Sequence, residues 1–165
     1  MTERDRMFWS SYAENPSTAT TNMMTREEVS LSLLVDKVAV ELEMRYLGGC
    51  CLIGSILLKE LLEKHGIKSE LIEGFFVYKN QWGRHYWLNL DNGKTIDIGQ
   101  DVTHQLDPRI PICPLTTETP KQKKKSSTQI ELEKSFRMYK EKGFSGLPNP
   151  PEWVLCLRSK LLTGA

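Results

Sequence analysis

The sequence lacks the long apolar runs and cysteine patterns that mark membrane-spanning and zinc-binding proteins. No stretch of about 18 consecutive apolar residues is present, so no membrane contact is expected. Residues 1–17 contain no continuous apolar core, so we expect no secretory signal and an intracellular protein, cytoplasmic or nuclear, with reduced thiols. The four cysteines are Cys50, Cys51, Cys113 and Cys156. They form neither a CxxC pair nor a Cys/His zinc pattern, so no metal site is expected.

The sequence also lacks a large net charge, but its charges are unevenly distributed. The net charge is +1. Residues 1–100 carry 11 Lys/Arg against 14 Asp/Glu, whereas residues 101–165 carry 11 against 7. Most of this excess lies in the run KQKKK, that is Lys121, Lys123, Lys124 and Lys125. Such a run is usually a solvated loop, here at about 115–128. Clustered lysines also bind phosphates, so these four are candidate nucleic-acid contacts.

No internal repeat divides the chain, and we expect one domain preceded by an arm. The 165 residues, of which 39% are hydrophobic and 26% charged, suffice for a sizeable core. Residues 1–24 are polar and are expected to form a flexible N-terminal arm. The arm's large side chains, which could dock it onto the domain, are Met7, Phe8, Trp9 and Tyr12. Residues 25–165 are expected to form the domain itself.

Two helices are predicted before the middle of the chain. Thr25 and Glu28 have the spacing of a capping box, and apolar residues then recur at helical spacing until the chain reaches Gly48. A second helix is expected from about Cys51 to His65. Polar residues are few within this second helix, so it should be well buried.

Three strands are predicted after the second helix. Residues 70–78 are apolar and aromatic, whereas residues 84–90 and 94–98 alternate around the turn DNG. Together these segments predict an α+β fold in which the cysteine-bearing helix packs on a small antiparallel sheet. Residues 101–127 are expected to be irregular. Residues 129–142 form a predicted amphipathic helix, and a final apolar segment follows a Pro-rich turn.

The DNG turn decides which residues share a face of the predicted hairpin. A two-residue Asn-Gly turn would place Asp97 on the face opposite His85. A three-residue loop instead gathers the apolar residues on one face and places His85, Trp87 and Asp97 on the other. We predict the three-residue loop, because only this register gives a coherent apolar face and because Gly93 can adopt the left-handed conformation it needs. A five-residue loop has the same parity and stays open. Either loop brings His85 close enough to Asp97 for a hydrogen bond.

Cys51 stands at the predicted N-terminus of a helix, where free backbone N–H groups and the helix dipole favour a thiolate. A nearby imidazole can take the proton of the thiol, and a carboxylate behind the imidazole fixes its tautomer. The sequence offers such a set in the order Cys, His, Asp, with one of the two adjacent cysteines followed by His85 and Asp97. The alternative is that Cys51 is a small core residue of an inactive scaffold and that His85 is a hydrogen-bonded sheet histidine.

Two segments of the sequence carry a resemblance to a known family. The segments GCCLIGSILLKELLEKHGIKSELIEGF and RHYWLNLDNGKTIDI resemble the transglutaminase-like branch of the papain-like cysteine enzymes, over roughly residues 48–101. In that family a cysteine opens a helix that ends at a glycine, and a His-x-Trp strand and an Asp strand follow. The resemblance implies that Cys51, fifteen residues before Gly66, is the nucleophile. It implies that His85 is the base and acid, that Asp97 orients it, and that Cys50 is a packing neighbour.

The resemblance also implies a reaction, namely acyl transfer through a thioester on Cys51. Hydrolysis of a protein or peptide amide, as in a protease or amidase, is the first expectation, and transfer to an amine is the second. This chemistry requires no cofactor. Candidates for the oxyanion hole or for substrate binding are Gln81, Trp82, Trp87 and Gln100. The alternative function is a non-catalytic transglutaminase-like module that binds protein or nucleic acid through the arm, the lysine run or the C-terminal helices.

Overall fold

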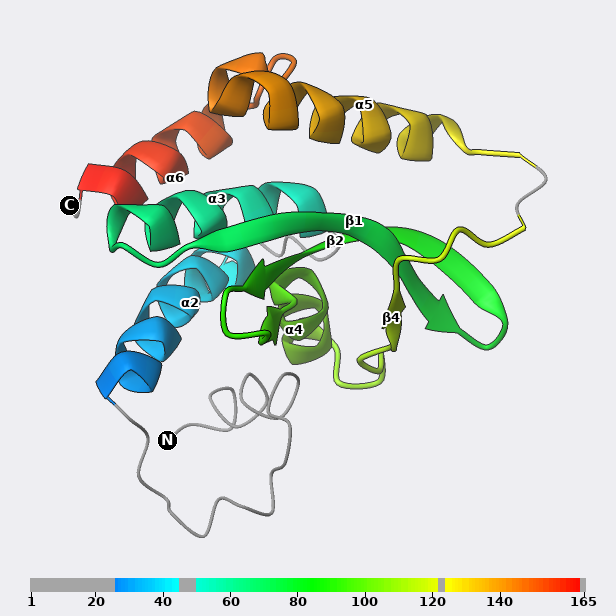
Figure 1. Cartoon of the computed structure of the whole chain (residues 1–165), viewed down its shortest axis with the longest axis horizontal. Helices are drawn as coiled ribbons and strands as arrows, with labels where there is room; N and C mark the ends of the chain where they lie inside the picture. The colour runs from blue at the N-terminus through cyan, green and yellow to red at the C-terminus, as the bar shows by residue number, and fades with distance from the viewer. Residues whose placement is uncertain (1–25, 45–49, 122–123, 164–165) are drawn as a thin grey trace, which may run out of the picture. The chain divides into compact units, whose positions relative to one another are not determined.

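The computed structural model describes residues 26–44, 50–121 and 124–163 (Figure 1). The helices in this part of the chain are α2 (Arg26–Met44), α3 (Cys51–Lys64), α4 (Ile98–Leu106), α5 (Ser127–Lys142), the 3-10 helix η2 (Gly143–Gly146) and α6 (Glu152–Thr163). The strands are β1 (Ser69–Tyr78), β2 (Gln81–Leu90), β3 (Thr95–Ile96) and β4 (Leu115–Thr116). They form an antiparallel sheet in the order β3-β2-β1-β4, so the predicted α+β class is confirmed.

The chain divides into two compact units. The first comprises residues 1–72 and 86–112, and the second comprises residues 73–85 and 113–165. The first unit therefore holds α2, α3, α4 and β3, and the second holds β4, α5, η2 and α6, while β1 and β2 contribute to both. The prediction of a single domain over residues 25–165 stays a prediction. Residues 1–24, predicted to be an arm, lie outside the described residues.

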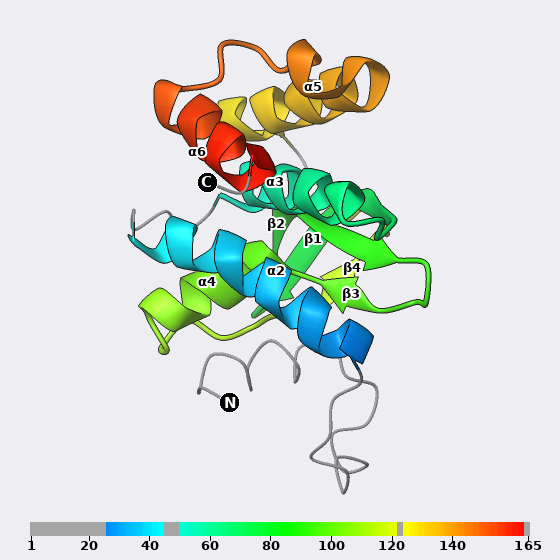
Figure 2. The same ribbon diagram turned by 90° about the vertical axis from the view of Figure 1, so that its left-hand side faces the viewer.

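The core of the first unit lies among its three helices, α2, α3 and α4, each of which contacts the other two (Figure 2). α3 is buried along most of its length, as its shortage of polar residues predicts. α2 packs against the other two helices through one stripe of buried apolar side chains. These side chains are Leu31, Val35, Val38, Ala39 and Leu42. Both predicted helices are thus confirmed, although Thr25, the predicted capping residue, lies outside the described residues. No helix in the described ranges is both long enough and apolar enough to cross a membrane.

The hairpin between β2 and β3 has the predicted register. Leu88 pairs with Ile96, and Asn89 pairs with Thr95. The backbone N–H of Leu90 donates to the carbonyl of Lys94 at 2.8 Å, which closes a three-residue loop. Gly93 in this loop has φ +85°, the left-handed conformation that favours glycine. The prediction of a three-residue loop is therefore confirmed.

Two predictions about the segment after this loop are wrong. Residues 94–98 do not continue as a strand, because β3 ends at Ile96 and α4 begins at Ile98. Residues 101–127 are not irregular throughout, because they include most of α4 and the short strand β4. The cause of the first difference is Asp97, whose side chain accepts a hydrogen bond from the backbone of Gln100 and so starts a helix.

The second unit begins with the tip of the β1–β2 hairpin. Lys79 and Asn80 both have positive φ, 47° and 62°, as a tight two-residue hairpin turn requires. β4 pairs with β1 through Phe75 and Thr116 and through Phe76 and Leu115. The predicted helix over residues 129–142 is confirmed and begins two residues earlier, because Ser126 caps it by accepting a hydrogen bond from Gln129.

Candidate active site

Cys51 is the first residue of α3, as predicted, and its side chain is buried. The first backbone N–H groups of a helix have no partner within the helix, and the dipole of α3 adds to their attraction for a negative sulfur. Cys50 is the N-cap residue and is half-buried. Burial is the larger cause and electrostatic interaction with the adjacent Cys51 the smaller; both raise the pKa of the Cys50 thiol. Cys50 is therefore a poor nucleophile at neutral pH.

The residues one turn after Cys51 make close contacts within the first unit. Ser55 is fully buried, and its hydroxyl donates to the carbonyl of Tyr86 in β2 at 3.4 Å. Gly54 allows a close approach, since an added Cβ would lie 3.1 Å from Leu42 Cδ1, which would have to shift slightly, and 3.4 Å from Ile98 Cγ2. Positions three and four residues after Cys51 lie on its side of the helix. These small residues thus let α3 approach both β2 and the start of α4.

Asp97 is buried at the N-cap of α4, and Gln100 holds its carboxylate. One carboxylate oxygen accepts from the backbone N–H of Gln100 at 3.1 Å, and the other accepts from its side-chain amide at 2.8 Å. These two bonds fix the orientation of the carboxylate. Gln100, predicted as an oxyanion-hole or substrate-binding candidate, thus has its amide on Asp97. The Asp-x-x-Gln spacing, typical of a capping box, was the sequence signal for this pair.

His85 lies in β2 within the second unit, and its ring is buried. The ring of Phe76 meets the imidazole edge-on, with ring centroids 5.7 Å apart and an angle of 88° between the planes. Gly83 makes room for that ring, because a Cβ on Gly83 would lie 2.2 Å from Phe76 Cε1. Phe76, whose ring fits over Gly83, therefore covers one side of the imidazole, which no sequence pattern had indicated.

Replacing Gly83 by alanine should push the Phe76 ring away from His85. We expect a loss of about 1–3 kcal/mol in the free energy of unfolding, which is typical of overpacking. Urea unfolding of the wild type and of Gly83→Ala measures this loss. The double variant Gly83→Ala/Phe76→Leu is the control, because a smaller side chain at position 76 should recover part of the lost stability. A single variant as stable as the wild type would contradict this packing.

The other residues predicted to form the oxyanion hole or to bind substrate differ in how far they are exposed to solvent. Trp87 is buried in β2. Gln81 and Trp82 are exposed at the start of β2, where the indole of Trp82 meets the ring of Phe75 edge-on. These findings leave their predicted roles untested. Of the four lysines predicted to contact nucleic acid, three are exposed, namely Lys121, Lys124 and Lys125. The fourth, Lys123, lies outside the described residues.

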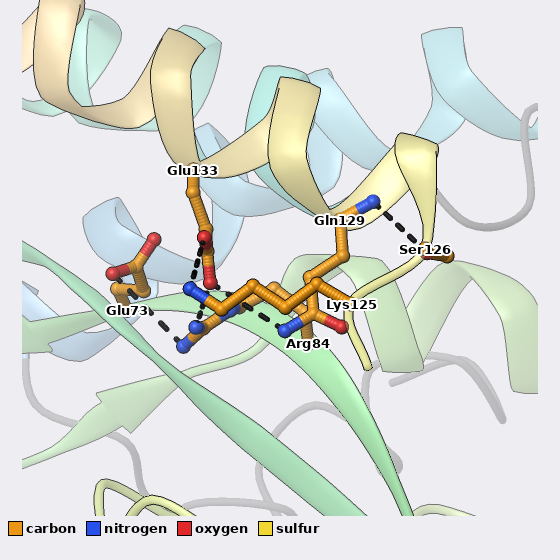
Figure 3. Close-up of polar contacts among 6 residues, drawn as sticks. All are labelled: Glu73, Arg84, Lys125, Ser126, Gln129 and Glu133. Atoms are coloured by element: carbon orange, nitrogen blue, oxygen red, sulfur yellow. Dashed lines mark hydrogen bonds and ion pairs between the residues drawn. The ribbon is translucent and has the colours of Figure 1, made fainter. Parts of the chain in front are cut away.

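A cluster of charged residues around Arg84 occupies the second unit (Figure 3). The guanidinium of Arg84 pairs with Glu133 of α5, and it lies 3.9 Å from Glu73 and 4.3 Å from the ring centroid of Phe75. Lys125 also pairs with Glu133, at 2.9 Å. Arg84 and Glu133 are 49 residues apart, and no pattern in the sequence indicates their pairing. This cluster ties α5 to the strand residue next to His85.

The charged partners in this cluster favour the ionised form of Glu133 despite its burial. Burial by itself raises the pKa of the Glu133 carboxyl, but hydrogen bonds from Lys125 and then from Arg84 outweigh it and lower the pKa below its ordinary value of 4.5. Glu133 and Arg84 are both largely removed from solvent, with side chains 8% and 13% exposed. An ion pair so little exposed is screened weakly by salt.

A cavity of about 230 Å³ lies in the first unit, and none of the predicted site residues lines it. Its walls are formed by Glu28, Leu31, Ile67, Lys68, Leu90, Asp91, Asn92 and Lys94. Glu28 and Lys94 are joined by an ion pair of 3.4 Å. Within the described ranges, no three His, Cys, Asp or Glu side chains are grouped in a way that could hold a metal ion.

Comparison with known proteins assigns no relative to the chain. No family model matches it, and neither a search of curated proteins nor a search of solved structures returns a match. The conclusions on function therefore depend on the residues themselves.

Proposed function

We propose that the protein is a cysteine-dependent acyl-transfer enzyme with a transglutaminase-like, papain-like fold. Cys51 is the proposed nucleophile, His85 the general base and acid, and Asp97 the residue that orients the imidazole. The substrate class is an amide of a protein or peptide. The resemblance of the two sequence segments supports this proposal, and so does the place of Cys51 at the start of α3.

One observation carries the proposal furthest. Gly54 and Ser55 lie one turn after Cys51 in α3. Each of them contacts a residue that stands next to His85 or Asp97 in the sequence. Ser55 bonds to Tyr86, which follows His85 in β2, and Gly54 packs against Ile98, which follows Asp97. Positions 54 and 55 lie on the same side of α3 as Cys51, so these contacts support the proposal.

The proposed reaction has two steps. His85 takes the proton of the Cys51 thiol, the sulfur attacks the amide carbonyl, and the imidazolium returns the proton to the leaving amine as the C–N bond breaks. This step leaves an acyl group on Cys51 as a thioester. Water, deprotonated by His85, then attacks the thioester and releases an acid while the C–S bond breaks. An amine in place of water would give amide exchange. The backbone N–H of Cys51 is a candidate donor to the oxyanion.

Alkylation by iodoacetamide between pH 5 and 9, quantified at each cysteine by mass spectrometry, tests this proposal. We expect selective modification of Cys51 below pH 7, because a thiolate paired with an imidazolium persists there, and slower modification in the His85→Ala variant. Cys50 is the internal control, since its raised pKa should keep it unmodified until the pH is high. Modification of Cys51 with the pH dependence of an ordinary thiol, unchanged in His85→Ala, would rule out the proposed pair.

A second candidate function is favoured by the charge of the second unit. Its residues, 73–85 and 113–165, include 12 Lys/Arg and only 6 Asp/Glu, whereas the first unit is acidic. A non-catalytic module could bind nucleic acid through this positive charge, with Lys121 and Lys124 among the exposed lysines. An unreactive Cys51 in the alkylation experiment would favour this candidate.

A further inference from the structure

One face of α2 exposes a row of large apolar side chains. Its members are Val29, Leu33, Val40 and Met44, which are 43%, 65%, 38% and 70% exposed. At 100° per residue these four positions fall within an arc of about 60° on the helix. We call them the α2 stripe. Ten large hydrophobic side chains are exposed in the described part of the chain, and four of them belong to this one helix face.

The α2 stripe lies opposite the buried stripe that packs on α3 and α4, so it takes no part in the core. The stripe consists of two pairs one turn apart, Val29 with Leu33 and Val40 with Met44, and the charged Asp36 and Lys37 lie on the turns between them. Single exposed apolar residues are ordinary on a protein surface, but a group of them on one helix face usually marks a surface that binds something. The stripe is small for a stable dimer: four side chains present no more than a few hundred Å², whereas a standard interface buries about 800 Å² on each partner. A segment tethered to the same chain needs far less area, because its effective concentration is high.

We propose that residues 7–12 of this chain bind to the α2 stripe. This segment, MFWSSY, contains four large side chains within six residues, namely Met7, Phe8, Trp9 and Tyr12. The segment precedes α2 in the sequence and lies outside the described residues. The proposal is independent of the proposed enzymatic function.

The length of chain between the two parts permits this contact. Thirteen residues lie between Tyr12 and Arg26, the first residue of α2, so the distance from Tyr12 to Arg26 is at most about 50 Å when this chain is fully extended. α2 has 19 residues and is about 28 Å long. Residues 7–12 can therefore reach every position of the α2 stripe, including Met44 at its far end.

Photo-crosslinking in the full-length chain tests the proposal. The crosslinking amino acid p-benzoylphenylalanine replaces Leu33, which is the most central and readily substituted member of the stripe because it is largely exposed. A matched variant carries the crosslinker at Lys64, an exposed position at the end of α3. Each protein is irradiated as an equal mixture of unlabelled and ¹⁵N-labelled chains, so that mass spectrometry separates crosslinks within one chain from crosslinks between two.

The expected result is a crosslink within one chain from position 33 to residues 7–12, absent from the Lys64 variant. Adding Phe8→Ser and Trp9→Ser should reduce the yield of this crosslink by roughly tenfold or more, because two buried aromatic side chains are lost. Crosslinks of mixed isotope from position 33 would overturn the proposal in favour of a second copy of the chain. A yield at position 33 no higher than at position 64, in protein whose circular dichroism is that of the wild type, would also overturn it.

Discussion

Incubation with p-nitrophenyl acetate should acetylate Cys51 and release a burst of p-nitrophenolate. In this reaction the thiolate attacks the ester carbonyl, and the C–O bond to the nitrophenyl group breaks. We expect the burst to disappear in Cys51→Ala and to persist in Cys50→Ala, a matched control one residue away. In His85→Ala the rate of acetylation should fall by roughly 10²- to 10⁴-fold, which is the usual contribution of a general base. Stopped-flow absorbance measures the rate, and mass spectrometry identifies the acetylated residue.

Asp97→Asn should separate the two roles of Asp97. Asparagine is as good an N-cap residue as aspartate, so α4 and the melting temperature should change little. The carboxylate that orients the imidazole is lost, so the rate of acetylation should fall roughly as far as in His85→Ala, by about 10²- to 10⁴-fold. An Asp97→Asn protein that acetylates Cys51 at the wild-type rate would show that Asp97 is only a helix cap. A burst of wild-type size in Cys51→Ala would refute the proposed nucleophile.

Glu133→Ala should destabilise the protein by about 2–4 kcal/mol at pH 7, because it removes one partner of a buried ion pair and leaves the Arg84 guanidinium with weaker partners. Glu73, at 3.9 Å and with a side chain 26% exposed, cannot replace the lost carboxylate. Glu73→Ala is the matched control, since it removes a second carboxylate from the same guanidinium. We expect it to cost less than about 1 kcal/mol, as for exposed ion pairs. Urea unfolding followed by circular dichroism measures both losses.

The same cluster should make stability depend on pH in acid. The pKa of Glu133 is lowered on folding, so the stabilisation it provides is complete above the pKa of the unfolded chain, near 4.5, and is lost as the pH falls through the lower folded-state pKa. Glu133→Gln has no charge to lose. The difference in stability between the wild type and Glu133→Gln should therefore be largest near neutral pH and should shrink below pH 4.5. A difference that stays constant from pH 7 to pH 3 would contradict the role assigned to the Glu133 charge.

Much of the local structure was predictable because it follows from short-range patterns. The apolar periodicity of α2 and α3 and the left-handed Gly93 in the hairpin loop are properties of a few neighbouring residues. The register of Leu88 against Ile96 was also predictable, since only one parity buries a coherent apolar face. The end of β3 was predicted wrongly because the alternation of residues 94–98 was given more weight than the Asp97–Gln100 capping spacing.

What the sequence by itself determined is the α+β class, the two helices around Cys50 and Cys51, and the hairpin that carries His85 and is followed by Asp97. The tertiary structure alone decided which distant residues meet: Ser55 with Tyr86, Gly83 with the Phe76 ring that braces His85, and Glu133 with Arg84. The physical reason is the separation along the sequence over which each kind of interaction acts. Turns, caps and amphipathic periods are set by interactions over a few residues. Contacts between side chains tens of residues apart instead depend on how whole elements pack, and no short pattern encodes them.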